Sequence, residues 1–334
     1  MNSLRCEALP PLPDPLGFAG MFGGISHGTV LCAGGANFSD TPMAKGGTRV
    51  WHDDVYALPE GGAWRIVGKI PAPRGYGVSG SWRGSVAMVG GNDGKRAVAD
   101  GCLVRWDGKS LHCERLPDLP VPITGACGTV VGDDLIVAGG QSVFDGPSAL
   151  ARCFACNLAA SSRTWRELPW PEGAPGRVLA VAGTDGRSFY LFTGAALSAD
   201  SSGKPQRRYL TDAWRFHSDT GWECLADLPR PAAAGPAAVP WLAKAHEFVL
   251  VGGIWAEYLA AADKKPVYPG FSRDVLVYSP RENRWRSEPP LDSDVPGRLV
   301  APCMELNGDW IIATGEIRPG HRTVAVERWV EVEA

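Results

Sequence analysis

Val30-Leu-Cys-Ala-Gly34-Gly35 is the first of six short apolar runs that end in glycine, and these runs decide the fold. The others are Val86-Ala-Met-Val-Gly90-Gly91, Leu135-Ile-Val-Ala-Gly139-Gly140, Phe189-Tyr-Leu-Phe-Thr-Gly194, Phe248-Val-Leu-Val-Gly252-Gly253 and Trp310-Ile-Ile-Ala-Thr-Gly315. The 334 residues shared among six units give about 56 residues each. A period of this length is typical of repeat architectures, in which each unit is one supersecondary element.

Each unit is predicted to contain four short strands. A polar loop and a second strand follow each glycine pair, as at Asp274-Val-Leu-Val-Tyr278, and a Trp-led strand then ends near proline, as at Trp165-Arg-Glu-Leu-Pro169. The repeat length and the Gly-Gly…Trp pattern resemble kelch repeats, which implies four-stranded antiparallel blades. We therefore predict an all-β, six-bladed β-propeller that forms a single domain. The expected blades are 15–72, 74–120, 122–171, 177–229, 235–296, and 298–334 together with 1–13.

The last unit lacks one strand, and the N-terminal segment is predicted to supply it. Leu4-Arg-Cys-Glu-Ala-Leu-Pro10 has the Leu-Pro ending of an outer strand. Pairing of this segment with the last blade would close the ring and remove the free edges of an open array.

Composition excludes several functional classes. The net charge of −3 provides no basic field for a nucleic-acid partner, and no run reaches the ~18 apolar residues of a membrane-spanning helix. Nine scattered cysteines and the absence of a secretory signal favour buried free thiols and a cytoplasmic location. With no histidine pair at ligand spacing, no P-loop and no dinucleotide fingerprint, we expect no metal and no cofactor.

Two sets of residues are expected at one mouth of the central channel, because the blade-to-blade connections and the loops after the glycine pairs lie at the same end. Arg74, Arg177 and Arg298 precede three inner strands and suggest an anionic ligand, since the guanidinium fork suits a carboxylate. Alternatively, each arginine pairs with a local carboxylate or carbonyl. The second set follows the glycine pairs and comprises Asn37, Asn92, Gln141, Trp255, Glu316 and Arg322.

Glu316 and Arg322 are the predicted catalytic residues. Glu316 is interpreted as replacing the second glycine of the repeat, and Arg322 returns beside it after Pro319-Gly320. In such a pair the arginine can bind a ligand carboxylate while the glutamate acts as general base. The alternative is a simple surface ion pair, which contributes little to stability.

Three stretches together resemble the N-acetylneuraminate epimerases, which are sialic acid mutarotases. They are Gly17-Phe-Ala-Gly20 with the following Gly24 to Phe38 segment, Pro73-Arg-Gly-Tyr-Gly-Val-Ser79 with the segment to Asp100, and Gly315-Glu-Ile-Arg-Pro-Gly-His-Arg322. The last matches the family pattern Gly-Glu-x-x-Pro-Gly-x-Arg in full. The order of the stretches differs from that of better-known members, so the chain resembles a cyclically permuted branch in which the mouth geometry is retained.

The resemblance implies an isomerase that interconverts the anomers of N-acetylneuraminate or a related sugar acid. Glu316 would take the proton of the anomeric hydroxyl, Arg322 would hold the carboxylate, and Arg74 or another arginine would assist. The main alternative is a non-catalytic kelch module that binds a ligand or an acidic peptide at the same mouth. A sialidase and a copper oxidase are less favoured, because the Ser-x-Asp-x-Gly-x-x-Trp turns and the His/Tyr clusters they need are missing.

Overall fold

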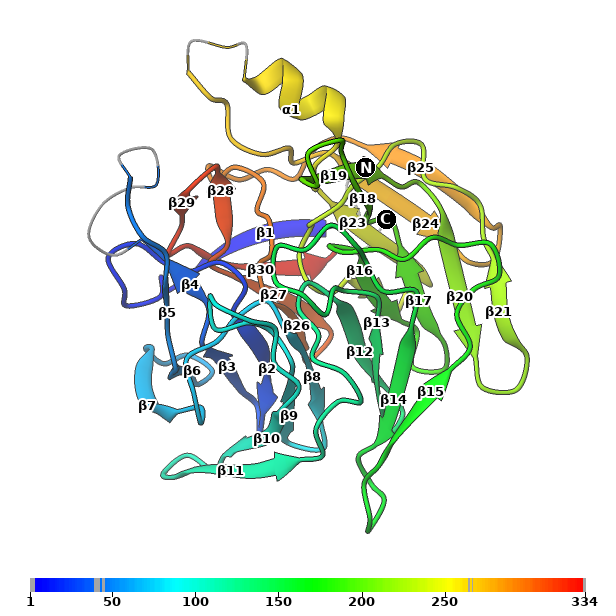
Figure 1. The fold of residues 1–334 in the computed structure, drawn as a ribbon. Helices are drawn as coiled ribbons and strands as arrows, with labels where there is room; N and C mark the ends of the chain where they lie inside the picture. Colours follow the sequence, from blue (N-terminus) through cyan, green and yellow to red (C-terminus); the bar gives the residue numbers. More distant parts are fainter. Residues whose placement is uncertain (1–3, 39–42, 44–45, 264, 266, 333–334) are drawn as a thin grey trace.

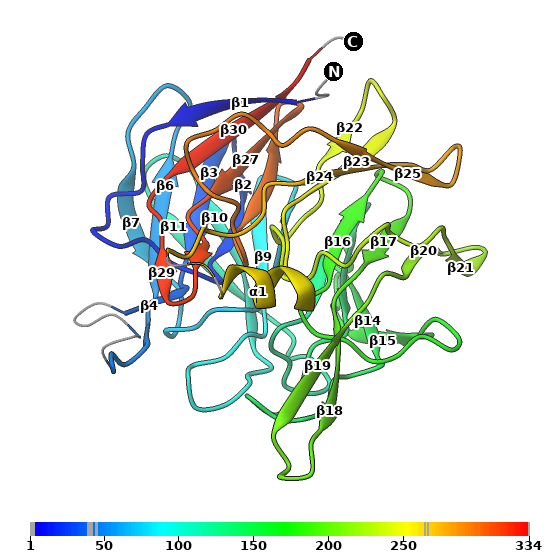
Figure 2. The ribbon, with the colours of Figure 1, turned by 90° about the horizontal axis from the view of Figure 1, so that it is seen from above.

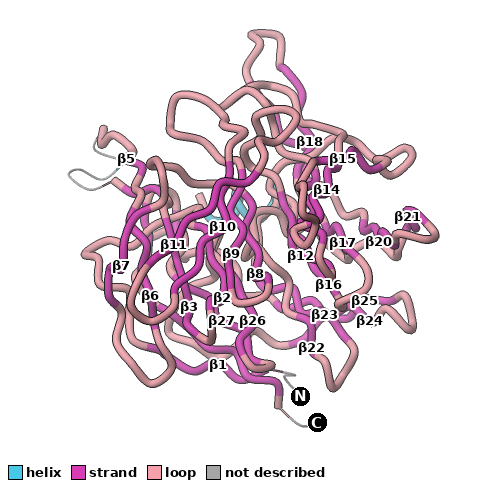
Figure 3. The backbone as a smooth tube through the Cα atoms, turned by 90° about the horizontal axis from the view of Figure 1, so that it is seen from below, coloured by secondary structure: helices cyan, strands magenta, loops and turns pink. Residues whose placement is uncertain are grey.

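Six four-stranded antiparallel sheets surround a central axis in the computed structural model, which describes residues 4–38, 43, 46–263, 265 and 267–332 (Figures 1 and 2). The predicted all-β, six-bladed propeller is confirmed. The inner strands of neighbouring blades line the axis and are visible together from below (Figure 3).

The blades follow one another along the chain, each running from an inner to an outer strand. The first two contain β2 (Phe22–Ser26), β3 (Thr29–Ala33), β6 (Asp54–Leu58) and β7 (Arg65–Lys69), then β8 (Val78–Trp82), β9 (Ser85–Val89), β10 (Gly101–Trp106) and β11 (Leu111–Leu116). The next two contain β12 (Cys127–Val131), β13 (Asp134–Ala138), β14 (Cys153–Asn157) and β15 (Trp165–Leu168), then β16 (Val181–Thr184), β17 (Phe189–Phe192), β20 (Ala213–His217) and β21 (Gly221–Cys224). The fifth contains β22 (Trp241–Leu242), β23 (Glu247–Val251), β24 (Val275–Ser279) and β25 (Arg284–Glu288).

The sixth blade joins the two ends of the chain. It contains β26 (Cys303–Leu306), β27 (Asp309–Ala313) and β30 (Val326–Glu331), with β1 (Leu4–Leu9) as its outer strand. β1 pairs antiparallel with β30 from Leu4 opposite Glu331 to Leu9 opposite Val326. The predicted ring closure by the N-terminal strand is therefore confirmed.

In four blades the recurring tryptophan links the blade to the one before it. Trp64, Trp165, Trp222 and Trp285 donate their indole N–H groups to the carbonyls of Pro10, Pro117, Pro169 and Ala226, at 2.8, 2.9, 2.6 and 2.9 Å. A partly buried indole needs such a partner, and carbonyls in or just before the Leu-Pro endings of the preceding blade supply it. The cysteines are less uniform than expected, because Cys113 and Cys224 on outer strands are exposed.

A closed ring of six backbone hydrogen bonds encircles the axis just before the inner strands begin. Each member donates its N–H to the carbonyl of its counterpart in the neighbouring blade, at 2.8–2.9 Å, and the last bond joins Gly20 to Val300. All six have positive φ, between 46° and 67°. We call this ring the collar; its members are Gly20, Tyr76, Gly125, Leu179, Ala234 and Val300.

The loops between the second and third strands of the blades rise on one side of the collar. They carry the hairpins β4–β5 (Ala36–Asn37 with Val50–Trp51), β18–β19 (Ala195–Ala199 with Pro205–Tyr209) and β28–β29 (Glu316–Arg318 with His321–Arg322), and the helix α1 (Ala256–Ala262) (Figure 1). Within the described part of the chain, no helix has the length and apolar character needed to cross a membrane.

Candidate active site

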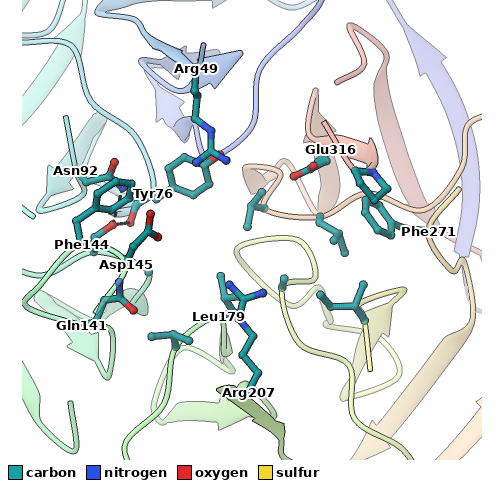
Figure 4. Close-up of a pocket in the computed structure, with 18 of the residues that line it drawn as sticks. Arg49, Tyr76, Asn92, Gln141, Phe144, Asp145, Leu179, Arg207, Phe271 and Glu316 are labelled. Atoms are coloured by element: carbon teal, nitrogen blue, oxygen red, sulfur yellow. Dashed lines mark hydrogen bonds between the residues drawn. The ribbon is translucent and has the colours of Figure 1, made fainter. Parts of the chain in front are cut away.

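A cavity of about 410 Å³ lies above the collar, at the end of the axis where the hairpins and α1 project. Five of the six collar residues also line the cavity: Tyr76, Gly125, Leu179, Ala234 and Val300. The polar groups around it come from several blades and comprise Arg49, Tyr76, Asn92, Thr124, Gln141, Asp145, Arg207 and Glu316 (Figure 4). Its volume falls within the ~300–1,000 Å³ common for small-molecule sites.

One position of the repeat faces the cavity in several blades. Antiparallel bridges pair Gly75 with Asn92, Thr124 with Gln141, and Leu299 with Glu316, so these three polar residues are structural equivalents. The corresponding residues elsewhere are Ala36, Ala195 and Ile254. Asn92, Gln141, Ile254 and Glu316 all line the cavity.

Asn37 and Trp255 are one residue further along than this position, and the structure does not bring them to the cavity lining. Successive side chains of an extended segment point to opposite faces, so a shift of one residue turns them away. The Asn37 side-chain oxygen lies 2.9 Å from Nε2 of His52, and the Trp255 ring packs 4.3 Å from the Arg230 guanidinium. In every blade the position that bridges to the inner-strand side directly follows the second glycine, and Asn37 and Trp255 come one residue after it.

Glu316 follows the second glycine of its repeat rather than replacing it, which corrects the sequence interpretation. Gly315 has a φ of 106°, like the second glycines of the other blades, and Leu299 bridges to Glu316. The residue that differs is Thr314, which occupies the first glycine position at a φ of 51°. Its hydroxyl accepts from the Phe18 N–H at 2.6 Å and donates to the Thr323 carbonyl at 2.7 Å.

Glu316 and Arg322 face each other across the β28–β29 hairpin. Nη1 of Arg322 lies 3.1 Å from Oε1 of Glu316, and the Gly320 N–H donates to the same oxygen at 2.8 Å. The Arg322 side chain is only 2% exposed and stacks 5.3 Å from the Phe38 ring, whereas the Glu316 side chain is 21% exposed. This is not a simple surface ion pair. One carboxylate oxygen is fixed, and Oε2 accepts no hydrogen bond from any described residue.

Arg74, Arg177 and Arg298 occupy equivalent positions, but the structure does not bring them into the cavity lining. Arg177 is fully buried and donates to both carboxylate oxygens of Asp212, at 2.8 and 2.5 Å. Arg74 is paired with Asp100, and Nη2 of Arg298 lies 3.0 Å from Oε1 of Glu327. These contacts favour the alternative of local pairing over ligand binding.

Sequence reasoning missed five of the polar residues that line the cavity: Arg49, Tyr76, Thr124, Asp145 and Arg207. Only Tyr76 lay within a quoted motif; the two arginines are in hairpins that have no counterpart in most repeats. Burial raises the pKa of the Tyr76 hydroxyl, while the nearby positive charges of Arg49 and Arg322 oppose that rise. In the described residues, no three His, Cys, Asp or Glu side chains are grouped to hold a metal ion.

The fold and this cavity define a six-bladed propeller with a carboxylate–guanidinium pair at one mouth. Residues 7–113 match the sequence model of the N-acetylneuraminate epimerase family, so the resemblance expected from the motifs is confirmed there. The matched segment includes Arg49, Tyr76 and Asn92, whereas Glu316 and Arg322 lie beyond it.

Individual curated relatives carry the same family name. N-acetylneuraminate epimerase of Haemophilus influenzae (strain PittEE) is 39% identical over 128 residues, covering 34% of each chain. That of Yersinia pestis (strain Pestoides F) is 43% identical over 108 residues, covering 29% of this chain and 27% of its own length. The similarity thus spans about a third or less of the length of these curated relatives. A solved structure entitled "Structure of YjhT" has the same fold, with a TM-score of 0.69 over 95% of both chains at 16% identity.

Proposed function

We propose that this protein is a mutarotase that interconverts the α and β anomers of N-acetylneuraminate or a closely related sugar acid. The observation that carries the proposal is the state of Glu316, whose Oε1 is fixed by Gly320 and Arg322 while Oε2 remains available at the cavity. The partial similarity to N-acetylneuraminate epimerases supports the choice of substrate.

The proposed reaction opens and recloses a cyclic hemiketal. Oε2 of Glu316 takes the proton of the anomeric hydroxyl as the bond between the anomeric carbon and the ring oxygen breaks, and the ring oxygen gains a proton from solvent. The open-chain keto acid then presents the other face of its carbonyl. Ring closure reverses both proton transfers, so Glu316 returns to its starting state and no atom is gained or lost.

Arg322 acts in this scheme as a positioning residue. Its Nη1 lies 3.1 Å from Oε1 of Glu316 and its side chain is almost wholly buried, so it is better placed to orient the carboxylate than to reach a ligand. The sequence-based hypothesis that Arg322 holds the ligand carboxylate is therefore replaced here by a role through Glu316.

The test follows anomer exchange by proton NMR after a sialidase releases the α anomer. We expect wild type to accelerate the decay to the β anomer, and Glu316→Gln to lose about 10²–10⁴-fold of that acceleration, the usual contribution of a general base. Glu257→Gln on the exposed face of α1 is the matched control and should behave as wild type.

Two results would contradict the proposal. Equal rates for Glu316→Gln and wild type would remove Glu316 from the chemistry. No acceleration by wild type, with N-acetylneuraminate, other ulosonic acids and common aldoses, would leave the binding module as the better account.

A further inference from the structure

One cation of the cavity is neither paired with a carboxylate nor fully hydrated. Arg49 immediately precedes β5 and lines the cavity. Among the described residues no carboxylate pairs with it, and its buried Nε has no hydrogen-bond partner. A guanidinium that has lost part of its water without gaining an anion is poised to accept one.

Three aromatic rings fix this guanidinium in place. Its central carbon lies 5.6 Å from the ring centroid of Phe38, 5.7 Å from that of Trp51 and 5.9 Å from that of Tyr76. Cation–π contacts restrain the position of an arginine without neutralising its charge. The planar fork therefore keeps its preference for a carboxylate, which it binds through two parallel hydrogen bonds.

The other arginines near the cavity are less suited to this task. Arg322 is committed to Glu316 and is 2% exposed. Arg207 lines the cavity from the opposite side, but its side chain is exposed, so water already satisfies it (Figure 4). Only Arg49 combines restraint, partial burial and an unpaired charge among the described arginines of the lining.

We propose that Arg49 binds the carboxylate of the ligand, and that this contact selects sugar acids over neutral sugars. The inference rests on the proposed function for the class of ligand and deepens it by naming the group that recognises the acid. Arg49, Tyr76 and Glu316 line the same cavity, and the Arg49 guanidinium lies 5.9 Å from the centroid of the Tyr76 ring. A carboxylate on the anomeric carbon would thus meet Arg49 while the anomeric hydroxyl meets Glu316.

The experiment compares an acid with its uncharged analogue. Dissociation constants of N-acetylneuraminate and its methyl ester would be measured by calorimetry for wild type, Arg49→Met, Arg49→Lys and Arg207→Met. We expect Arg49→Met to weaken binding of the acid about 10- to 100-fold, the loss typical of hydrogen bonds to a charged group, and to leave ester binding nearly unchanged. Arg49→Lys should recover part of the preference, and Arg207→Met should retain it.

The outcomes separate this inference from the proposed function. Retention of the acid-over-ester preference by a folded Arg49→Met protein would overturn the inference, even if wild type accelerates anomer exchange. Loss of the preference in that variant would support it, even if wild type shows no acceleration. Wild type that binds neither compound would overturn it as well.

Discussion

Arg177 and Arg49 both lie near the propeller mouth, but one has a carboxylate partner and the other does not. Arg177 is fully buried, and Asp212 and the Thr193 carbonyl accept its hydrogen bonds. Arg49 lies among three aromatic rings and has no carboxylate partner in the described chain. The comparison teaches that an arginine's partner, rather than its place in a repeat, decides whether it supports the fold or receives a ligand.

Arg74, Arg177 and Arg298 share a structural task. Each lies before the inner strand of its blade and pairs with a carboxylate at or near the start of the third strand of the same blade. The pair therefore ties two strands together at the mouth. Recurrence in alternate blades is thus a property of blade construction, and it does not by itself indicate a ring of ligand-binding charges.

The largest expected effect is the loss of stability in Arg177→Met. Removing one partner of a buried ion pair leaves an uncompensated charge and typically costs about 3–5 kcal/mol, which urea unfolding would measure. Arg166→Met is the control, because the Arg166–Asp134 pair is half-exposed and should contribute at most about 1 kcal/mol. If Arg177→Met were as stable as the control while ligand binding failed, the distinction between arginines that stabilise the fold and arginines that bind a ligand would be wrong.

Arg74→Met should have a smaller effect on the free energy of unfolding. Its partner Asp100 is 41% exposed and would remain hydrated after the substitution, so the loss is limited to hydrogen bonds with a charged group, about 1–3 kcal/mol. Parallel urea unfolding of Arg74→Met and Arg177→Met would test this order of losses in the free energy of unfolding. A larger loss in Arg74→Met than in Arg177→Met would mean that burial of the partner does not set the cost.

The smallest effect is the pH dependence that protonation of Glu327 gives the wild-type protein, and it appears only in acid. Burial raises the pKa of this carboxyl, but the charges of Arg298 and Arg273 and the hydrogen bond from Ser293 outweigh it, so the net pKa is lowered. The stabilisation is therefore present above the unfolded value, about 4.3, and is lost as pH falls through the folded pKa.

Urea midpoints from about pH 3 to about pH 7 would measure this dependence. Wild type should lose stability more steeply than Glu327→Gln at the acid end, because the glutamine cannot take up the proton. Parallel curves would show that Glu327 is not held ionised by Arg298.

The repeats, the six blades and the closing N-terminal strand were predictable, because apolar runs and turn residues recur in the sequence at a regular interval. The side of the chain that faces the cavity was predictable for Asn92 and Glu316, but not for Asn37 and Trp255, where an error of one residue reverses the face. Arg49 could not be recognised, since it lies in an inserted hairpin and its role depends on rings from Phe38 and Tyr76 that only folding brings together.

The collar has a consequence for the electric field at the mouth. Its six N–H···O=C bonds follow one another around the axis, each from one blade to the next, so the tangential components of their dipoles cancel over the full circle. A helix end, by contrast, would direct a fixed partial charge along its axis. The backbone of the collar therefore carries no formal charge, and the formal charge that a ligand meets is set by a few replaceable side chains such as Arg49 and Glu316.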